Sequence, residues 1–153
     1  MFSFETIIFL ASSFLNLILI YYKIPVKVQQ QILALLLVIF VIFLDRFFRR
    51  KDAGVVNATA RLFLIFLTAL MVQLMVLSTG GFFSPFLILL HLYTLGTSFL
   101  LNLQASIIFL ILSVLMLVLH IFWDQNLLVL FKQDPFSFAL YLISFIIIIP
   151  LTQ

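Results

Sequence analysis

Long apolar runs separated by short polar intervals dominate the chain. Most runs approach 20 residues, the length at which a helix rising about 1.5 Å per residue crosses roughly 30 Å of hydrocarbon. Polar residues do not alternate with apolar ones inside the runs, as the strands of a transmembrane barrel would require. The pattern therefore predicts six helical spans, at residues 6–22, 28–44, 60–78, 85–103, 104–123 and 136–151.

The composition points to the same environment. Apolar residues make up 66% of the 153 positions and charged residues 8%, whereas soluble domains have about 45–50% and about 25%. A soluble domain of this size has too much surface to bury so much Leu, Ile and Phe. We therefore expect one domain, residues 1–153: an all-α membrane protein, built as a bundle of six transmembrane helices.

The first span has the position of a secretory signal peptide but not its features. The span is preceded by Glu5 and by no basic residue, and no small-x-small cleavage site stands before Tyr21 and Tyr22. We expect a retained transmembrane helix.

Lysine and arginine in the short loops predict the orientation, because cytoplasmic loops carry the excess of positive charge. With the N-terminus inside, the inner side holds Arg46, Arg49, Arg50, Lys51 and Arg61, and the outer side holds Lys23, Lys27 and Lys132. We expect cytoplasmic N- and C-termini in a multi-pass protein of the inner (cytoplasmic) membrane. Topology then accounts for the net charge of +3, and no nucleic-acid partner is expected.

The large polar side chains inside the spans share one depth. Asn16, Gln73, His91 and His120 each lie a few residues from the outer end of a span, about 5–10 Å below the outer surface. Unpaired polar groups are costly in hydrocarbon, so we expect all four to face the bundle interior.

The fourth and fifth spans each carry a polar stripe at helical spacing. One stripe contains Ser84, His91, Thr94, Ser98 and Asn102, and the other contains Ser106, Ser113 and His120. The short connection at residues 102–104 predicts that the two helices are antiparallel neighbours. Gly96 would let them pack closely through small residues and interhelical hydrogen bonds.

These polar residues have a structural and a functional interpretation. A single Asn or Ser in a membrane helix usually joins helices, at about 0.6 kcal/mol per bond. The two histidines are either satisfied by neighbouring carbonyl and hydroxyl groups, or exchange protons with a ligand near neutral pH. With no Cys, and no acidic residue in the spans, they do not predict a metal site. The sequence has no nucleophile constellation, phosphate loop or carboxylate pair, so we expect no catalytic residues and no enzyme.

The connection between the third and fourth spans is the most distinctive segment. It consists of Gly80, Gly81, Phe82, Phe83, Ser84, Pro85 and Phe86. The two glycines permit positive φ, Ser84 is a candidate cap for the fourth helix, and Pro85 fits its first position. The three phenylalanines predict an aromatic lip at the outer interface, beside free backbone N–H groups. Such a lip suits a flat amphiphile with carbonyl oxygens, although a simple tight turn needs the same residues.

At these residues the chain resembles the six-helix membrane regions of two-component sensor histidine kinases. A Gly-Gly-x-x-Asn-Pro-Phe heptapeptide marks the redox sensors of the RegB/PrrB type, and a Gly-Gly-x-x-Ser-Pro form is similar to the PilS type. Gly80, Gly81, Pro85 and Phe86 match both, and Ser84 matches the second. In the redox sensors this loop is implicated in quinone recognition. The resemblance implies that role for the four matching residues, with a quinone as the candidate cofactor.

The same family continues into a dimerisation helix with a phosphorylated histidine, followed by an ATP-binding domain. The present sequence stops at residue 153, directly after an apolar run. We therefore expect the sensor half of a longer protein, with a free-standing relative that lacks an output domain as the alternative. The resemblance implies a homodimer and a cytoplasmic kinase output domain as partners, in addition to the lipid bilayer.

The resulting hypothesis is a membrane-embedded sensory input domain. A hydrophobic, redox (quinone-like) or membrane-state signal would bind in the outer half and pass through the sixth helix. The candidate ligand-binding residues are Gly80, Gly81, Phe82, Ser84, Pro85, Phe86, His91 and His120, with Asn16, Gln73 and Thr94 as polar lining.

The alternative is a small polytopic transport subunit that captures a small molecule, of the type found in vitamin-uptake complexes. It would need a docking surface of small residues, for which the sequence offers Ala11, Ser12 and Ser13. A scaffold that only assembles partners is the third interpretation.

Overall fold

The computed structural model describes residues 3–49 and 58–151. The helices in this part of the chain are α1 (Phe4–Tyr21), α2 (Val26–Arg49), α3 (Ala58–Ser78), α4 (Leu87–Leu100), α5 (Leu103–Trp123), α6 (Gln125–Gln133) and α7 (Pro135–Leu151), with the short 3-10 helix η2 (Gly81–Phe83) between α3 and α4. The all-helical fold is therefore confirmed for the described residues.

Four helices are long and apolar enough to cross a membrane, namely α1, α2 over Val26–Phe47, α3 and α5. They indicate a multi-pass membrane protein. α4 has 14 residues, about 21 Å at 1.5 Å per residue, which is shorter than a straight crossing. α6 and α7 are apolar together but bend by 99° at their junction. All six predicted spans thus contain a helix, but the fourth and sixth are not simple straight spans.

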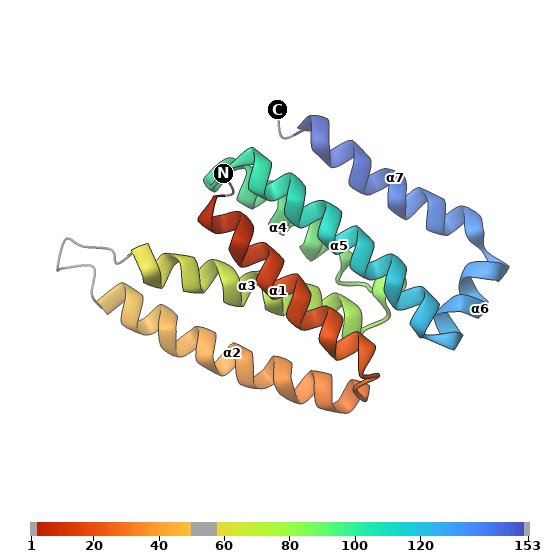
Figure 1. Ribbon diagram of the computed structural model, residues 1–153, viewed down its shortest axis with the longest axis horizontal. Coiled ribbons are helices and arrows are strands. Elements are labelled where there is room, and N and C mark those ends of the chain that lie inside the picture. Colours follow the sequence, from red (N-terminus) through yellow and green to blue (C-terminus); the bar gives the residue numbers. More distant parts are fainter. Residues whose placement is uncertain (1–2, 50–57, 152–153) are drawn as a thin grey trace.

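The helices α1, α3 and α5 form the centre of the bundle. α1 packs against both α3 and α5, α2 covers α3, and α4 packs against α5 and α3. α2 and α7 lie at opposite edges (Figure 1). The start of α1, the end of α2, the start of α3 and the end of α7 point toward one end of the bundle. The α1–α2 turn, η2 and α6 lie toward the other end (Figure 1).

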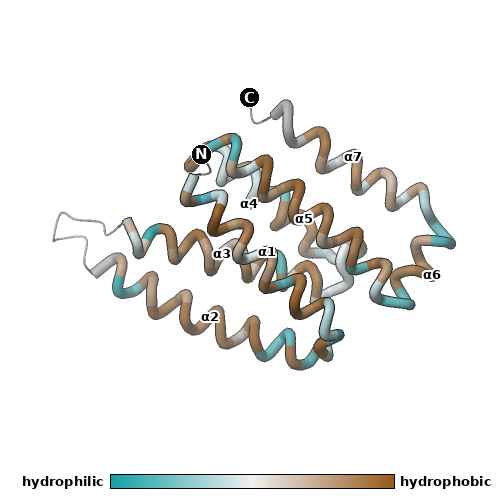
Figure 2. Tube along the Cα trace, viewed as in Figure 1, coloured by the Kyte–Doolittle hydropathy of each residue, from teal (hydrophilic) through white to brown (hydrophobic). Residues whose placement is uncertain are grey.

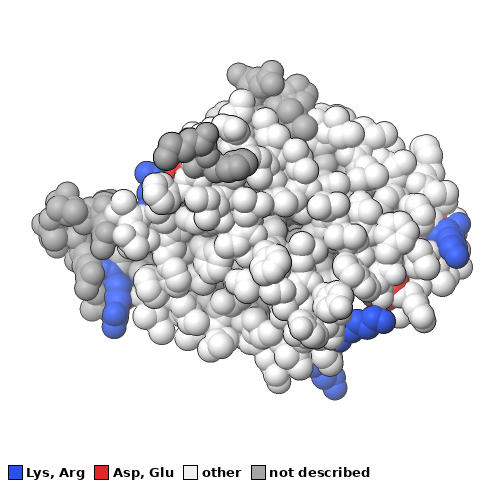
Figure 3. Space-filling view, in the orientation of Figure 1, with Lys and Arg blue, Asp and Glu red and all other residues white. Residues whose placement is uncertain are grey.

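Aromatic rings fill the core where α1, α4 and α5 meet. Phe9 is fully buried, and its ring centroid lies 4.8 Å from that of Phe109 and 6.5 Å from that of Tyr93. Large apolar side chains also face outward, among them Leu35 on α2 and Ile146 on α7, which are 61% and 63% exposed. The middle of most helices is apolar (Figure 2), and the charged atoms on the visible face gather toward the two ends (Figure 3). This distribution fits a bilayer around the bundle.

The helix α6 lies where the sequence predicted only a loop. The Asp124 carboxylate accepts the Asn126 N–H at 2.9 Å and caps its start, and Lys132 lies in its last turn. Only Leu127 of this helix is fully buried. Its nine residues are too few to register in a search for spans of about 20 residues.

Candidate functional site

A buried polar cluster joins the three central helices. Gln73 Nε2 donates to the hydroxyl oxygens of Ser13 (2.9 Å) and Ser113 (3.0 Å), and Gln73 Oε1 accepts from Asn16 Nδ2 at 3.1 Å. All four side chains are buried. Asn16 and Gln73 therefore face the interior, as expected. Their bonds run from helix to helix, which supports the structural interpretation for this cluster.

The turn after α3 requires glycine at two positions. The φ angle is +117° at Gly80 and +60° at Gly81, a region that residues with a side chain rarely adopt. Gly81 is also crowded, because a Cβ there would lie 2.8 Å from the His120 Nδ1 atom. Residues 80–86, called the hairpin below, therefore lie with their backbone against the end of α5.

Ser84 closes the turn that precedes α4. Its hydroxyl accepts the Phe86 N–H at 3.1 Å and lies 2.5 Å from the Thr79 hydroxyl. Helix α4 begins at Leu87 with Phe86 as its N-cap. The Ser84 hydroxyl makes the expected bond, but the predicted helix start is two residues too early, because residues 85 and 86 form a turn before α4.

Phe82 points into the protein and not outward. It is 1% exposed, and its ring centroid lies 4.5 Å from that of Phe138 and 6.3 Å from that of Phe145, both on α7. The half-buried Phe83 ring packs near Tyr141 at 6.3 Å. The predicted open aromatic lip is therefore wrong at Phe82, because α7 supplies an apolar cover that removes the ring from the interface.

His91 connects α4 to α7 through a hydrogen bond and a ring contact. Its Nδ1 atom donates to the Leu87 carbonyl at 2.8 Å, and its Nε2 atom lies 2.9 Å from the Ser144 hydroxyl oxygen. The ring stacks on Phe145 with the centroids 4.1 Å apart. Both nitrogens thus have partners within the protein, of the carbonyl and hydroxyl kind that the structural interpretation anticipated.

His120 lies at the wall of a cavity of about 340 Å³ between the α1–α2 turn and the end of α5. Lys23, Gln29 and Asp124 line the same cavity, together with apolar side chains and Trp123. The His120 Nδ1 atom is buried without a hydrogen-bond partner in the described part of the chain. The imidazole therefore stands between the cavity and the Gly80–Gly81 turn.

A second hollow, of about 430 Å³, separates α5 from α7. Its walls are apolar and include Leu110 and Val114 of α5 and Leu142 and Ile146 of α7. α7 is thus not packed tightly along its whole length. Among the described residues, its polar attachment to the bundle is the bond between Ser144 and His91.

The structure distributes the predicted residues over three places. Asn16 and Gln73 lie in the central cluster, His91 contacts α7, and His120 contacts the hairpin; no hydrogen bond or ring contact among the described residues joins the two histidines. The buried Thr94 hydroxyl donates to the Leu90 carbonyl of its own helix.

The predicted contact between α4 and α5 exists, but Gly96 does not provide it. The Ser106 hydroxyl donates to Thr97 Oγ1 at 3.2 Å across this pair of helices. A Cβ at Gly96 would meet nothing within 4 Å. The expectation of close packing at Gly96 is therefore wrong, since this glycine faces open space.

Sequence reasoning missed several contributors to these sites. Ser144 and Phe145 meet His91, and Lys23 and Gln29 line the His120 cavity. Ser144 was detectable as a polar residue in the middle of the last apolar run. The cavity residues carried no comparable signal, because their positions near the α1–α2 turn explain their polarity.

No family model, curated protein or solved structure matches this chain. Its function must therefore be inferred from the chemistry of these sites.

Proposed function

We propose that this chain is a membrane-embedded sensory domain for a hydrophobic or amphiphilic signal that carries carbonyl oxygens, as quinones do. The signal binds in the cavity beside His120. Its effect passes through the hairpin at residues 80–86 to α7 and from there toward the C-terminal end. The domain binds and transmits, and it does not catalyse a reaction.

The position of the hairpin carries this proposal. The Gly81 backbone lies against His120 at the cavity wall, and the next residue, Phe82, packs on Phe138 and Phe145 of α7. A ligand that displaces the imidazole therefore pushes on a turn that holds two rings of α7. If the ligand binds one arrangement of these groups more tightly than the other, it shifts the balance between them.

The cavity has the chemistry that such a ligand needs. Its volume of about 340 Å³ falls within the range of roughly 300–1,000 Å³ for small-molecule pockets. The Lys23 ammonium and the His120 ring can donate to carbonyl oxygens, while Ile20 and Trp123 offer apolar surface. Lys23 is positioned there by the turn that ends α1, in which its φ is +48° and its N–H donates to the Ile20 carbonyl at 2.9 Å.

The topology that fits this role has six crossings, with a short α4 and with α7 as the last crossing after its bend from α6. Both termini are then cytoplasmic and the protein lies in the inner membrane. A kinase output domain after α7 would read the displacement of that helix, and a second copy of the chain would complete a dimer, as the resemblance to the sensor kinases implies.

The proposal is tested by thermal unfolding in detergent, with decylubiquinone as the probe. The wild-type midpoint should rise with probe concentration. His120→Ala should lose most of that rise, whereas His91→Ala, the matched histidine outside the cavity, should keep it. An equal rise in the wild-type and His120→Ala proteins would place the probe elsewhere and reject the site.

The transport alternative has less support from the described contacts. Ser12 and Ser13, two of the three small residues that could dock a partner, are buried against neighbouring helices. A panel of water-soluble vitamins in the same unfolding experiment separates the two functions, because only the transport subunit should be stabilised by one of them.

A further inference from the structure

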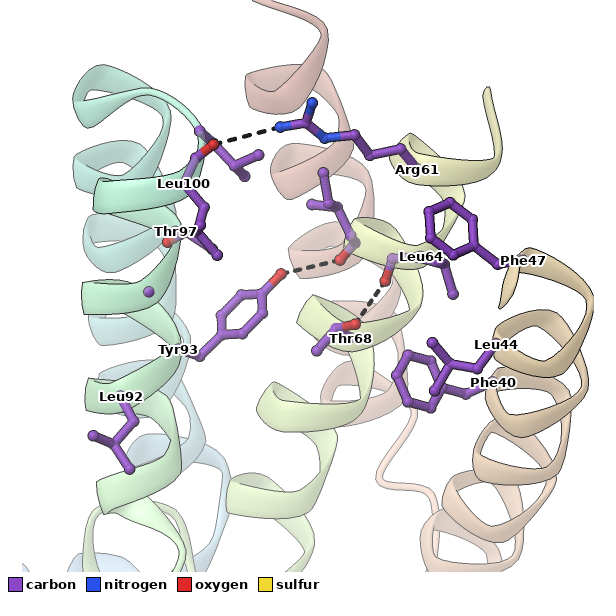
Figure 4. Close-up of a pocket in the computed structure, with 13 residues that line it drawn as sticks. Phe40, Leu44, Phe47, Arg61, Leu64, Thr68, Leu92, Tyr93, Thr97 and Leu100 are labelled. Atoms are coloured by element: carbon purple, nitrogen blue, oxygen red, sulfur yellow. Dashed lines mark hydrogen bonds between the residues drawn. The ribbon is translucent and has the colours of Figure 1, made fainter. Parts of the chain in front are cut away.

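An apolar groove opens between α2 and α4, over the surface of α3. Its volume is about 520 Å³. Phe40, Leu44 and Phe47 of α2 form one wall, and Leu92 and Tyr93 of α4 belong to the other (Figure 4). The groove is separate from the His120 cavity, which lies beside the α1–α2 turn.

Gly96 keeps the groove open. It belongs to the α4 wall, and a Cβ built on it would meet no atom within 4 Å. Glycine in a helix interior costs roughly 0.5–1 kcal/mol relative to alanine. Here the glycine relieves no close contact between helices, so its structural effect is the space itself.

The polar groups of the groove are satisfied within the protein, with one exception. Tyr93 donates to the Ile65 carbonyl at 3.1 Å, and Thr68 donates to the Leu64 carbonyl at 2.6 Å (Figure 4). The exposed Arg61 makes a single long bond of 3.4 Å to the Leu100 carbonyl at the mouth. A guanidinium has five N–H donors, so Arg61 can also bind an anion. The groove thus combines an apolar trough with a cation at one end.

The dimensions match one leaflet of a bilayer. The α4 residues of the groove run from Leu92 to Leu100, about 12 Å at 1.5 Å per residue. The hydrocarbon of one leaflet is about 15 Å thick. Arg61 lies at the end of the bundle where α2 ends and α3 begins, which the loop charges predict to be cytoplasmic. Anionic lipids of that leaflet attract basic groups near the membrane surface.

We propose that this groove binds an anionic phospholipid of the surrounding leaflet. One acyl chain lies between α2 and α4 along Gly96, and the phosphate accepts hydrogen bonds from Arg61. The bound lipid fills the space between α2 and the centre of the bundle. This site does not depend on the sensory function proposed above.

Native mass spectrometry of the detergent-purified chain tests the site, with phosphatidylglycerol and phosphatidylcholine of identical acyl chains as probes. We expect one retained lipid per chain and a preference of about fivefold for phosphatidylglycerol, the effect of one cation near a phosphate.

Gly96→Leu fills open space, so the protein should fold but retain both lipids several-fold less. Arg61→Gln should keep retention and abolish the preference. Arg46→Gln, which removes a charge near the end of α2 without altering the groove lining, should change neither.

Circular dichroism should show the same helical content for Gly96→Leu as for the wild type, and Arg61→Gln alters only an exposed side chain. Undiminished lipid retention in Gly96→Leu would overturn the groove as the acyl site. An unchanged preference in Arg61→Gln would overturn the headgroup assignment. Retention of free fatty acid in place of phospholipid would also contradict the proposal.

Discussion

Gly81 is the residue at which the hairpin and the cavity meet. Its φ of +60° suits glycine, and the His120 imidazole occupies the place that a side chain would need. Gly96, in contrast, has an ordinary helical backbone and open space around it. The two glycines therefore serve different purposes, one allowing a close approach and the other leaving a groove.

Gly81→Ala should destabilise the fold by about 1–2 kcal/mol, because it places a Cβ in the left-handed region. It should also displace His120. Unfolding in mixed detergent micelles, followed by circular dichroism, measures the loss. In a His120→Ala background, Gly81→Ala should lower the free energy of unfolding by a smaller amount, because the clash with the imidazole is gone. Some loss should remain, because the positive φ at residue 81 is unchanged. Gly96→Ala is the control and should not destabilise; a similar loss there would show that the contact at Gly81 has no special cost.

Gln73→Leu should cost about 1–2 kcal/mol, since it removes three interhelical bonds worth about 0.6 kcal/mol each on average. Those bonds join α1, α3 and α5. The same unfolding assay applies. Ser98→Ala is the matched control, because the Ser98 hydroxyl donates only to the Leu95 carbonyl of its own helix. Equal stability of the two variants would contradict the role of the polar cluster.

The residues of these sites differ in how far the sequence could predict them. Asn16 and Gln73 were identified because a polar side chain in a long apolar run must find a partner. Their partner Ser13 and the Ser144 partner of His91 were not, since the bonds join positions 60 and 53 residues apart. No local pattern relates such positions.

At the scale of elements, α7 is the helix with the least continuous support. Phe138 and Phe145 anchor it on Phe82, and Ser144 bonds to His91. An apolar hollow of about 430 Å³ separates it from α5. Discrete anchors with open space between them allow two packing arrangements more readily than a continuous interface does.

The first turn of α7 should depend on pH. The Asp134 carboxylate accepts the Ser137 hydroxyl and the Ser137 N–H, and these bonds lower the pKa of Asp134 below its ordinary value of 3.8. The stabilising contribution is therefore present above the unfolded pKa and disappears as the pH falls through the folded pKa. The Ser137 amide resonance in nanodiscs should titrate with a midpoint below 3.8. Asp134→Asn should remove the transition, and a midpoint at or above 3.8 would contradict the capping bonds.

The elements were predictable where local signals agree with length. The predicted span 104–123 differs by one residue from α5, because Asn102 caps its start by accepting the Gln104 N–H. The predicted start of α4 was two residues too early, because residues 85 and 86 form a turn before Leu87. α6 was not predicted, because its apolar side is only two turns long, although Asp124 stands at its N-cap and Asp134 at its C-cap.

At the scale of the whole molecule, three central helices are joined by hydrogen bonds, and α2 and α7 lie at the edges. The Gln73 cluster links α1, α3 and α5, while α2 and α7 lie at opposite edges beside apolar hollows (Figure 1). Motion is therefore expected at the edges. The α7 edge is connected to the cavity beside His120 through Phe82 and Gly81, and the start of α2 lines the same cavity with Val26 and Gln29. We assign the transmitted response to α7, the last helix before the C-terminal end, and a supporting lipid to the groove beside α2.

The most direct test is a distance between spin labels, which the absence of cysteine from the chain makes clean. Labels at Leu15→Cys on α1 and Ile143→Cys on α7 replace exposed side chains, and a reference pair joins Leu15→Cys to Ile111→Cys on α5, which the Gln73 cluster links to α1. In nanodiscs, decylubiquinone should shift the α1–α7 distance by about 1–2 Å or more and leave the reference distance unchanged. In the Phe82→Ala variant, which lacks the ring between the hairpin and α7, the probe should not change the α1–α7 distance. An α1–α7 distance that does not respond to the probe, or that responds equally without the Phe82 ring, would contradict transmission through the hairpin.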